Sequence, residues 1–119
     1  MEDQVSLVNQ KIVPSLSLEL SAKFLRGLGD PNRLRILELL VEKERNVNQL
    51  VELLRAPQGR VSNHLACLRW CGYVSTKRKG KYIYYQVTDA RVSQIIKLVK
   101  QIMADNKEHI EACQRITQV

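Results

Sequence analysis

The sequence predicts a mainly α-helical protein with a small β-hairpin, arranged as a winged helix-turn-helix. Three observations predict this fold class. Apolar residues recur at helical spacing through most of the chain, two short helices meet at a corner around Ala56-Pro57, and after Gly72 the apolar period changes from about 3.6 residues to about 2. The 119 residues suffice for one domain with a modest core. We expect an N-terminal arm over residues 1–14 and a single winged-helix domain over residues 15–119.

About five helices are expected, and a clear boundary separates the first two. The first helix, within residues 15–29, places apolar side chains near one face and ends at its glycines. Asp30 offers a side-chain acceptor to the start of the second helix, and Pro31 fits the first turn because its missing N–H has no partner there. In the first helix the residues near one face are Leu18, Ala22, Leu25 and Leu28. In the second helix the residues expected to be buried are Leu34, Leu37 and Val41, with Ile36 and Leu40 alongside.

The third and fourth helices form a helix-turn-helix candidate. Residues 47–55 make a short helix, and Pro57 begins the next helix, which ends at Gly72. The positions expected to face the core are Val47, Leu50, Val51 and Leu54 in the short helix and Val61, Leu65 and Leu68 in the longer one. Two short helices joined by a tight corner are typical of this motif.

A β-hairpin and a long final helix complete the predicted fold. Residues 73–78 and 82–87 are rich in Tyr, Val, Ile and Thr, and a basic segment separates them. Thr88 or Asp89 caps the final helix. Its apolar stripe is too wide for an exposed tail and needs a packing partner; the stripe consists of Val92, Ile95, Ile96, Val99, Ile102 and Met103.

The charge balance favours an anionic partner, and signs of an enzyme or of a membrane protein are missing. Nineteen Lys and Arg residues against twelve Asp and Glu give a net charge of +7, which is typical of proteins that bind nucleic acid or anionic membranes. Because no run of about eighteen apolar residues occurs and the N-terminus is acidic and polar, we expect a cytoplasmic protein without a membrane partner. A glycine-rich phosphate loop is absent, and two histidines leave little for acid–base catalysis.

The predicted fold implies a surface for double-stranded DNA, because its second short helix fits the major groove while the hairpin reaches phosphates. Four cations surround the glycine at the tip of the wing: Lys77, Arg78, Lys79 and Lys81. Polar side chains that can donate to bases or phosphates lie on the second helix at Gln58, Arg60, Ser62, Asn63, His64 and Arg69. The alternatives are a solvated basic hairpin without a partner and ordinary exposed polar positions.

Three segments of the chain carry a recognisable pattern: the helix start "GDPNRLRILELL", the recognition helix "VSNHLACLRWCGYV" and the wing strand "GKYIYYQV". Together they resemble the ArsR/SmtB family of winged-helix repressors over roughly residues 18–103. The resemblance implies a homodimer, joined through the first and last helices. It also implies that this dimer binds palindromic operators and leaves them when a metal ion binds.

The resemblance further implies that cysteines bind the effector ion. Two sites used in the family are missing: the short helix before the recognition helix has no cysteine, and the final helix begins Asp89-Ala90-Arg91, where a zinc site needs Asp-x-His. The spacing of Cys67 and Cys71 in the recognition helix is similar to that of CmtR-type cadmium and lead sensors. This likeness implies a third thiolate from the C-terminal region of the other subunit, for which Cys113 is the candidate.

Helical geometry allows the thiolates of Cys67 and Cys71 to share one ion. Residues four apart have Cβ atoms about 6 Å apart on one face, which suits metal–sulfur bonds of about 2.3 Å. The same separation exceeds the roughly 3.5–4.5 Å that a disulfide requires. Thiolates favour soft ions, which include Cd(II), Pb(II), As(III), Zn(II) and Hg(II). The likeness to CmtR-type sensors implies Cd(II) or Pb(II) as the effector, with As(III), Zn(II) and Hg(II) as further candidates.

Other roles stay open for these residues. Cys67 and Cys71 also suit small buried apolar positions, and Cys113 suits a bystander near the terminus. His64 fits either a fourth ligand or a part of the recognition-helix pattern. A separate zinc trio on the final helix would consist of Asp105, His109 and Cys113. The protein is accordingly expected to be a metal-released repressor, or else a constitutive or redox-responsive regulator, or a thiol metal carrier whose winged helix binds protein.

Overall fold

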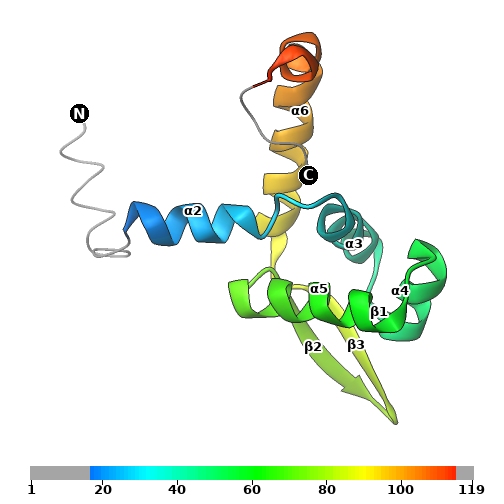
Figure 1. Ribbon diagram of the computed structural model, residues 1–119. Coiled ribbons are helices and arrows are strands. Elements are labelled where there is room, and N and C mark those ends of the chain that lie inside the picture. Colours follow the sequence, from blue (N-terminus) through cyan, green and yellow to red (C-terminus); the bar gives the residue numbers. More distant parts are fainter. Residues whose placement is uncertain (1–16, 115–119) are drawn as a thin grey trace.

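A computed structural model describes residues 17–114, so the predicted arm over residues 1–14 lies outside the described part. The described elements are α2 (Leu18–Arg26), α3 (Pro31–Glu42), β1 (Arg45–Asn46), α4 (Val47–Leu54), α5 (Gln58–Cys71), β2 (Val74–Lys79), β3 (Tyr82–Val87) and α6 (Ala90–Ala112). In Figure 1, α3, α4, α5 and the hairpin β2–β3 form one body, from which α2 and α6 extend in different directions. The predicted winged helix-turn-helix is confirmed.

The wing belongs to a three-stranded antiparallel sheet in the order β1–β3–β2. Gly80 forms the tip of the hairpin with a φ of 63°, a left-handed conformation that glycine adopts readily. The sequence predicts only the two strands of the hairpin, and β1 is an additional strand. In β1, Arg45 pairs with Tyr85 and Asn46 pairs with Tyr84. Because an Arg-Asn dipeptide has no apolar alternation, backbone pairing with β3 creates this strand without a signal in the sequence.

The core lies where α3, α4, α5 and the sheet meet. The most deeply buried side chains are Tyr73, Ile36, Leu37, Leu50, Leu65, Leu68 and Val61. These positions confirm the stripes predicted for α4 and α5. In α3 the prediction is wrong at one position, because Val41 is 41% exposed whereas Leu39 is 3% exposed. Helix α3 packs against α4, α5 and β3 at once, so its buried face is wider than one stripe and is turned away from Val41.

The helix ends follow the expected chemistry. The Asp30 carboxylate accepts the backbone N–H of Asn32 at 2.8 Å, and Gly72 ends α5 with a φ of 91°. Asp89, rather than Thr88, caps α6. The Thr88 hydroxyl instead donates to the carbonyl of Gly72 at 2.6 Å, which ties the start of α6 to the end of α5.

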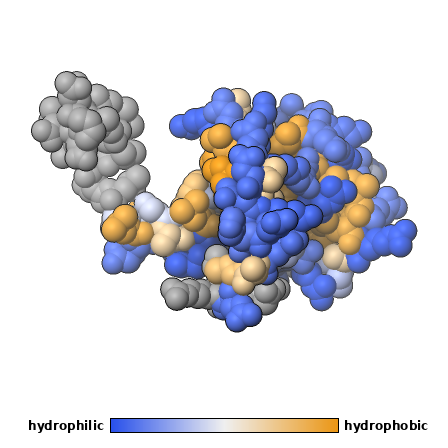
Figure 2. Space-filling model, turned by 90° about the horizontal axis from the view of Figure 1, so that it is seen from above, coloured by the Kyte–Doolittle hydropathy of each residue, from blue (hydrophilic) through white to orange (hydrophobic). Residues whose placement is uncertain are grey.

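Two helices keep large apolar side chains at the surface. No residue of α2 is buried, so the face predicted to carry Leu18, Ala22 and Leu25 is exposed in the single chain, whereas Leu28 in the following turn is buried. Figure 2 shows hydrophobic side chains at the surface along α2. The large apolar side chains exposed on the two helices are Leu18, Leu20, Phe24 and Leu25 on α2 and Leu98, Val99, Ile102, Met103 and Ile110 on α6.

These exposed faces belong to helices that cannot cross a bilayer. Within residues 17–114, no helix combines the length and the apolar character that a membrane span needs. Contiguous apolar patches on a small protein commonly mark an interaction surface. The packing partner that the sequence predicted for α6 is therefore supplied only in part by the same chain, through Val92 and Ile96.

Candidate DNA-binding surface and thiol site

Helix α5 presents a polar face to solvent. Its apolar side is fixed in the core, and α4 leads into it through Arg55, which adopts the left-handed conformation with a φ of 54°. Of the predicted recognition residues, Ser62 and His64 are half-buried. The exposed ones are Gln58, Arg60, Asn63 and Arg69. The elements therefore leave most of these donors accessible to a ligand on the outer side of α5.

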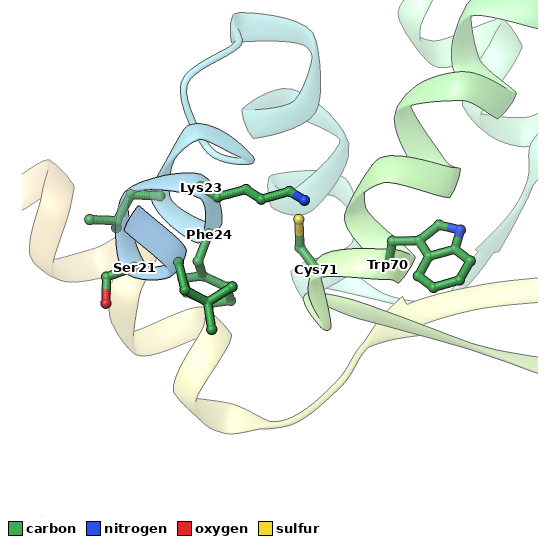
Figure 3. Close-up of a pocket in the computed structure, with 7 residues that line it drawn as sticks. Ser21, Lys23, Phe24, Trp70 and Cys71 are labelled. Atoms are coloured by element: carbon green, nitrogen blue, oxygen red, sulfur yellow. The ribbon is translucent and has the colours of Figure 1, made fainter. Parts of the chain in front are cut away.

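Trp70 is an exposed aromatic residue near the end of α5 that the sequence analysis did not single out. It is 90% exposed, although tryptophan is highly buried on average. Figure 3 shows its ring pointing away from α2. The helical wheel could have revealed this, because Trp70 falls one turn after Ala66 and two turns after Asn63 on the exposed side.

The four cations of the wing differ in their partners. Lys79 forms an ion pair with Glu44, and the Lys77 Nζ atom lies 3.5 Å from the other oxygen of that carboxylate. The hydrogen bond from Lys79, together with the charge of Lys77, lowers the pKa of Glu44. Arg78 donates to the carbonyl of Gly80 at 3.2 Å, and the Lys81 Nζ atom lies 5.7 Å from the centroid of the Tyr82 ring. All four cations are exposed, but only two meet a carboxylate of the described residues. Glu44 was not part of the predicted surface, and it partly neutralises two of the cations that were.

All three cysteines of the chain are half-buried free thiols. Cys67 and Cys71 lie one turn apart on α5, and Cys71 packs against the hydrophobic core. Cys113 follows the last residue of α6. We call Cys67 and Cys71 the thiol pair. Their helical spacing brings the two sulfur atoms to one side of α5, as the sequence predicted.

The thiol pair by itself fits two bonds to a soft ion. Within residues 17–114, no three His, Cys, Asp or Glu side chains come together as a metal site. Within the described residues, one chain thus offers no third His, Cys, Asp or Glu side chain beside the two thiols. The structure does not assemble the alternative zinc trio of Asp105, His109 and Cys113. A reason is that Asn106 leaves helical geometry, with a φ of −126°, so the residues on its two sides do not share one face.

The Cys71 thiol lies at the end of α2 in a mixed environment. Burial raises the pKa of the Cys71 thiol and the neighbouring Cys67 raises it further, while Lys23 and Arg33 act in the opposite direction. Figure 3 shows the Lys23 side chain extending from α2 toward the Cys71 sulfur. Cys71 is therefore a protonated thiol near neutral pH, with a cation placed to stabilise its thiolate.

His64 lies near the start of α3. Burial opposes ionisation of Asp30, but the backbone N–H groups of Arg33 and Asn32 and the charge of His64 lower the pKa of Asp30 overall. His64 and the thiol pair do not form a three-ligand metal site in the described chain. The fourth-ligand alternative, which also needs a thiolate from another subunit, stays a prediction.

A groove of about 770 Å³ between α2 and the end of α5 was not predicted from the sequence. Its lining includes Leu20, Lys23, Phe24, Leu25, Trp70 and Cys71. The Tyr73 hydroxyl donates to the carbonyl of Phe24 at 2.8 Å and holds α2 at this place. The contact joins segments far apart in the sequence, so no local sequence pattern predicts it.

Comparison with known proteins agrees with this architecture. The family described as bacterial regulatory protein, arsR family, matches residues 30–76. A probable mercury resistance operon repressor from Streptomyces lividans is 41% identical over 104 residues, which cover 87% of this chain and 83% of the relative. The matched family region begins at the Asp30 cap and includes the whole helix-turn-helix, as the resemblance implied.

Solved structures share the fold. The crystal structure of Rv0081 from M. tuberculosis has a TM-score of 0.75 and 30% identity, covering 82% of this chain and 100% of that one. The homodimeric winged helix-turn-helix DNA-binding domain Mb0332 from Mycobacterium bovis has a TM-score of 0.67 and 26% identity, covering 86% of this chain and 89% of that one. The relatives are named as regulators and not as enzymes, as expected. The chain therefore belongs to the ArsR family of bacterial regulatory proteins.

Proposed function

We propose that this protein is a transcriptional repressor that binds operator DNA as a homodimer and releases it when a soft metal ion binds. In this proposal Cys67 and Cys71 of one subunit supply two thiolate ligands, and Cys113 of the other subunit supplies a third. The observation that carries it is the position of two neighbouring thiols on the recognition helix, at its junction with α2. The protein acts in the cytoplasm, where thiols stay reduced.

The polar face of α5 and the wing support recognition of double-stranded DNA. A helix of this kind lies in the major groove, where Asn63 and Arg69 would reach base edges or phosphates. The wing cations would neutralise phosphates beside the groove, so affinity should fall as salt rises. The proposed DNA contacts are Gln58, Arg60, Ser62, Asn63, His64, Arg69, Lys77, Arg78, Lys79 and Lys81.

The exposed apolar faces of α2 and α6 support a homodimer. A two-fold interface pairs the same patch of both subunits, which covers both faces at once. The structural relative from Mycobacterium bovis is named as homodimeric. Two copies of α5 would then face two half-sites about one helical turn of DNA apart.

The chemistry of the thiol pair supports a thiophilic ion. Thiolates favour Cd(II), Pb(II), As(III), Zn(II) and Hg(II) over the hard ions that oxygen ligands hold. Hg(II) is satisfied by two thiolates, and the relative from Streptomyces lividans is named for mercury resistance. Cd(II) and Pb(II) favour the third thiolate that Cys113 of the other subunit would add. Binding of Hg(II) thus needs one chain, whereas binding of Cd(II) or Pb(II) needs the dimer.

Release would follow from the place of the thiols on the DNA-reading helix. To share an ion, Cys67 and Cys71 must lose their protons to solvent and turn both sulfur atoms toward one point. Both residues belong to the last turns of α5, so this change acts on the helix that would lie in the groove. A coupling of about 1–3 kcal/mol, or about five- to 150-fold in affinity, is typical of linked sites and suffices for derepression.

Metal-induced release by cysteine variants tests the proposal. A duplex is selected from random-sequence DNA by the metal-free protein, and its affinity is measured by fluorescence anisotropy at one salt concentration, with Cd(II), Pb(II), Zn(II), As(III) and Hg(II) added in turn. Cys67→Ser and Cys71→Ser should bind the duplex normally and lose the release. The matched variant Cys113→Ser should lose the response to Cd(II) and Pb(II) and keep that to Hg(II). Release that survives in Cys67→Ser would place the effector site elsewhere.

A metal-independent regulator is the second candidate, and one observation favours it. Cys71 packs against the hydrophobic core as a small apolar side chain would. This candidate predicts that Cd(II) produces no thiolate-to-metal charge-transfer absorption and leaves the duplex bound. A thiol metal carrier that binds protein would instead show weak duplex binding with little salt dependence.

A further inference from the structure

The Cys71 thiol lies close against the last turn of α2. Gly27 follows α2, and a Cβ atom added there would lie 3.4 Å from Cys71 Sγ and 3.1 Å from Cε2 of Tyr73. Gly27 thus leaves little more than the space of one Cβ atom beside the Cys71 sulfur and the Tyr73 ring. A shift of the Cys71 sulfur is therefore felt by Tyr73 and by the backbone at the end of α2.

An aromatic pair joins α2 to the residue that follows the cap of α5. The rings of Phe24 and Tyr73 are stacked, with centroids 4.4 Å apart and planes inclined by 25°, and the Tyr73 hydroxyl donates to the Phe24 carbonyl at 2.8 Å. Tyr73 is 1% exposed. Its backbone N–H donates to the Leu68 carbonyl at 2.9 Å and completes the C-terminal cap of α5. Tyr73 thus moves with the end of α5 and holds α2.

Helix α2 is attached to the body through its last turn. The Arg33 guanidinium donates to the carbonyls of Gly27 at 2.7 Å and Arg26 at 3.0 Å, which adds a contact from α3. No residue of α2 itself is buried, and Figure 1 shows the helix extending away from the body. Its nine residues span about 13 Å, so a rotation of about 10° at the last turn would move Leu18 by about 2 Å.

The two helices near the thiol pair differ in how easily they can move. Helix α5 is anchored in the core by Val61, Leu65 and Leu68, each at most 1% exposed, so rotating it within the domain would break close packing. Helix α2 has no such anchor. A rearrangement at the thiol pair is therefore relieved most easily by a change in the angle of α2.

We propose that Phe24 and Tyr73 are positioning residues that transmit occupation of the thiol pair to α2, and through α2 to the dimer. The inference rests on the metal-sensing function proposed above. When the two sulfur atoms turn toward a shared ion, Cys71 Sγ leaves its place beside Gly27, and the Tyr73 ring shifts with it. The stack and the hydrogen bond carry this shift to Phe24. Because α2 belongs to the dimer interface, the spacing between the two copies of α5 changes and no longer fits two half-sites.

The experiment compares metal binding with metal-induced release in the full chain. Tyr73→Phe removes the hydroxyl donor and keeps the ring, while Phe24→Leu removes the stacked ring and keeps an apolar side chain. Tyr85→Phe removes a hydroxyl from β3 and is the matched control. Binding of Hg(II) is followed by charge-transfer absorption and by the fluorescence of Trp70, the only tryptophan of the chain. The affinity of the selected duplex is measured with and without Hg(II).

We call the transmission from the thiol pair through Tyr73 and Phe24 to α2 the relay. It predicts that variants of these two residues bind metal normally but release the duplex less. Tyr73→Phe and Phe24→Leu should bind Hg(II) within about threefold of the unchanged protein, while the loss of duplex affinity caused by Hg(II) falls from the range of about five- to 150-fold to below about threefold. Tyr85→Phe should keep the full loss. Circular dichroism confirms folding, and if Phe24→Leu does not fold, Tyr73→Phe decides alone.

Three outcomes would overturn the relay. Full release by Tyr73→Phe with normal Hg(II) binding would do so and would leave metal sensing intact. Loss of Hg(II) binding in Tyr73→Phe would assign Tyr73 to the metal site itself instead of to transmission. If the unchanged protein neither binds Hg(II) nor releases the duplex, metal sensing fails and the relay fails with it.

Discussion

The DNA-reading half of the chain and its two flanking helices differ in what they do with their apolar side chains. In α3, α4 and α5 the central residues are fully buried, since Leu37, Leu50 and Leu65 are each 0% exposed. On α2 and the outer part of α6, comparable residues stay in solvent, with Leu18 85% exposed and Ile102 60% exposed. The reading half therefore has a core of its own, whereas the flanking helices leave apolar faces exposed, which in the proposed dimer another copy would cover.

This difference in burial makes the reading half rigid and leaves the flanking helices free to change their angle. An element buried on all sides cannot shift without opening a cavity, which costs stability in proportion to its volume. An element that packs on a partner can change its angle and repack at lower cost. The thiol pair lies on the rigid part, and Cys71 lies beside the end of the adjustable part near Gly27. In the proposed dimer, the boundary between the two regions is thus the place where we expect a small ligand to have most effect.

Shortening a core leucine should have the largest effect. Leu65 is 0% exposed, and Leu65→Ala should lower the free energy of unfolding by about 2–5 kcal/mol, because it removes buried methyl groups and leaves a cavity. Leu53→Ala on α4 is the matched control, since Leu53 is 47% exposed and its loss should stay below about 1 kcal/mol. Urea denaturation followed by circular dichroism measures both. Equal losses would contradict a self-contained core.

A charge on the exposed face of α6 should separate the subunits and leave each one folded. Ile102→Asp puts a carboxylate into the proposed interface, where it loses water without gaining a partner. We expect the dissociation constant of the dimer to rise by at least about tenfold in analytical ultracentrifugation, with an unchanged circular dichroism spectrum. Gln101→Asp is the control, because helical geometry places Gln101 away from the apolar stripe. If Ile102→Asp unfolds the chain, this face belongs to the subunit core.

The self-contained half could be predicted well because its signals are local. The Asp30 cap, the left-handed Gly72 and the change of period at the wing each report the chemistry of a few neighbouring residues. Val41 was assigned wrongly because burial on α3 is decided by three neighbouring elements together. The short strand at Arg45 depends on backbone pairing alone, so the side-chain pattern could not reveal it.

The candidate site could be predicted only in part. The spacing of Cys67 and Cys71 follows from helical geometry, which the sequence displays. The stacking of Phe24 on Tyr73 joins residues 49 positions apart, and no local period reports such a contact. Glu44 was missed for the same reason, since its partners on the wing are distant in the chain.

Loss of the α3 cap should weaken the junction between the two regions moderately. Asp30→Ala removes the acceptor for two backbone N–H groups and should lower the free energy of unfolding by about 1 kcal/mol, whereas Asp30→Asn keeps an acceptor and should lower it less. Although burial opposes it, hydrogen bonding and charge lower the pKa of Asp30 below 3.8. The carboxylate therefore stabilises the fold above the unfolded pKa, and this contribution is lost as the pH falls through the folded pKa.

Urea denaturation of Asp30→Ala and the unchanged protein between about pH 7 and about pH 3 should accordingly show a difference that shrinks toward acid. A difference that stays constant over this range would mean that the ionised carboxylate adds nothing beyond a neutral acceptor.

Removing the carboxylate that pairs with the wing cations should have the smallest effect. It tests whether ion pairs within the reading half reduce its binding to DNA. Phosphates must compete with Glu44 for Lys77 and Lys79. Glu44→Gln should therefore raise duplex affinity by about two- to fivefold and steepen the dependence of log affinity on log salt by up to about 0.9 for each added phosphate contact. Glu108→Gln removes the same charge from the outer part of α6 and should leave the slope unchanged. If both variants give the salt dependence of the unchanged protein, Glu44 does not compete with phosphates for the wing cations. The reading half would then be self-contained only in its hydrophobic core.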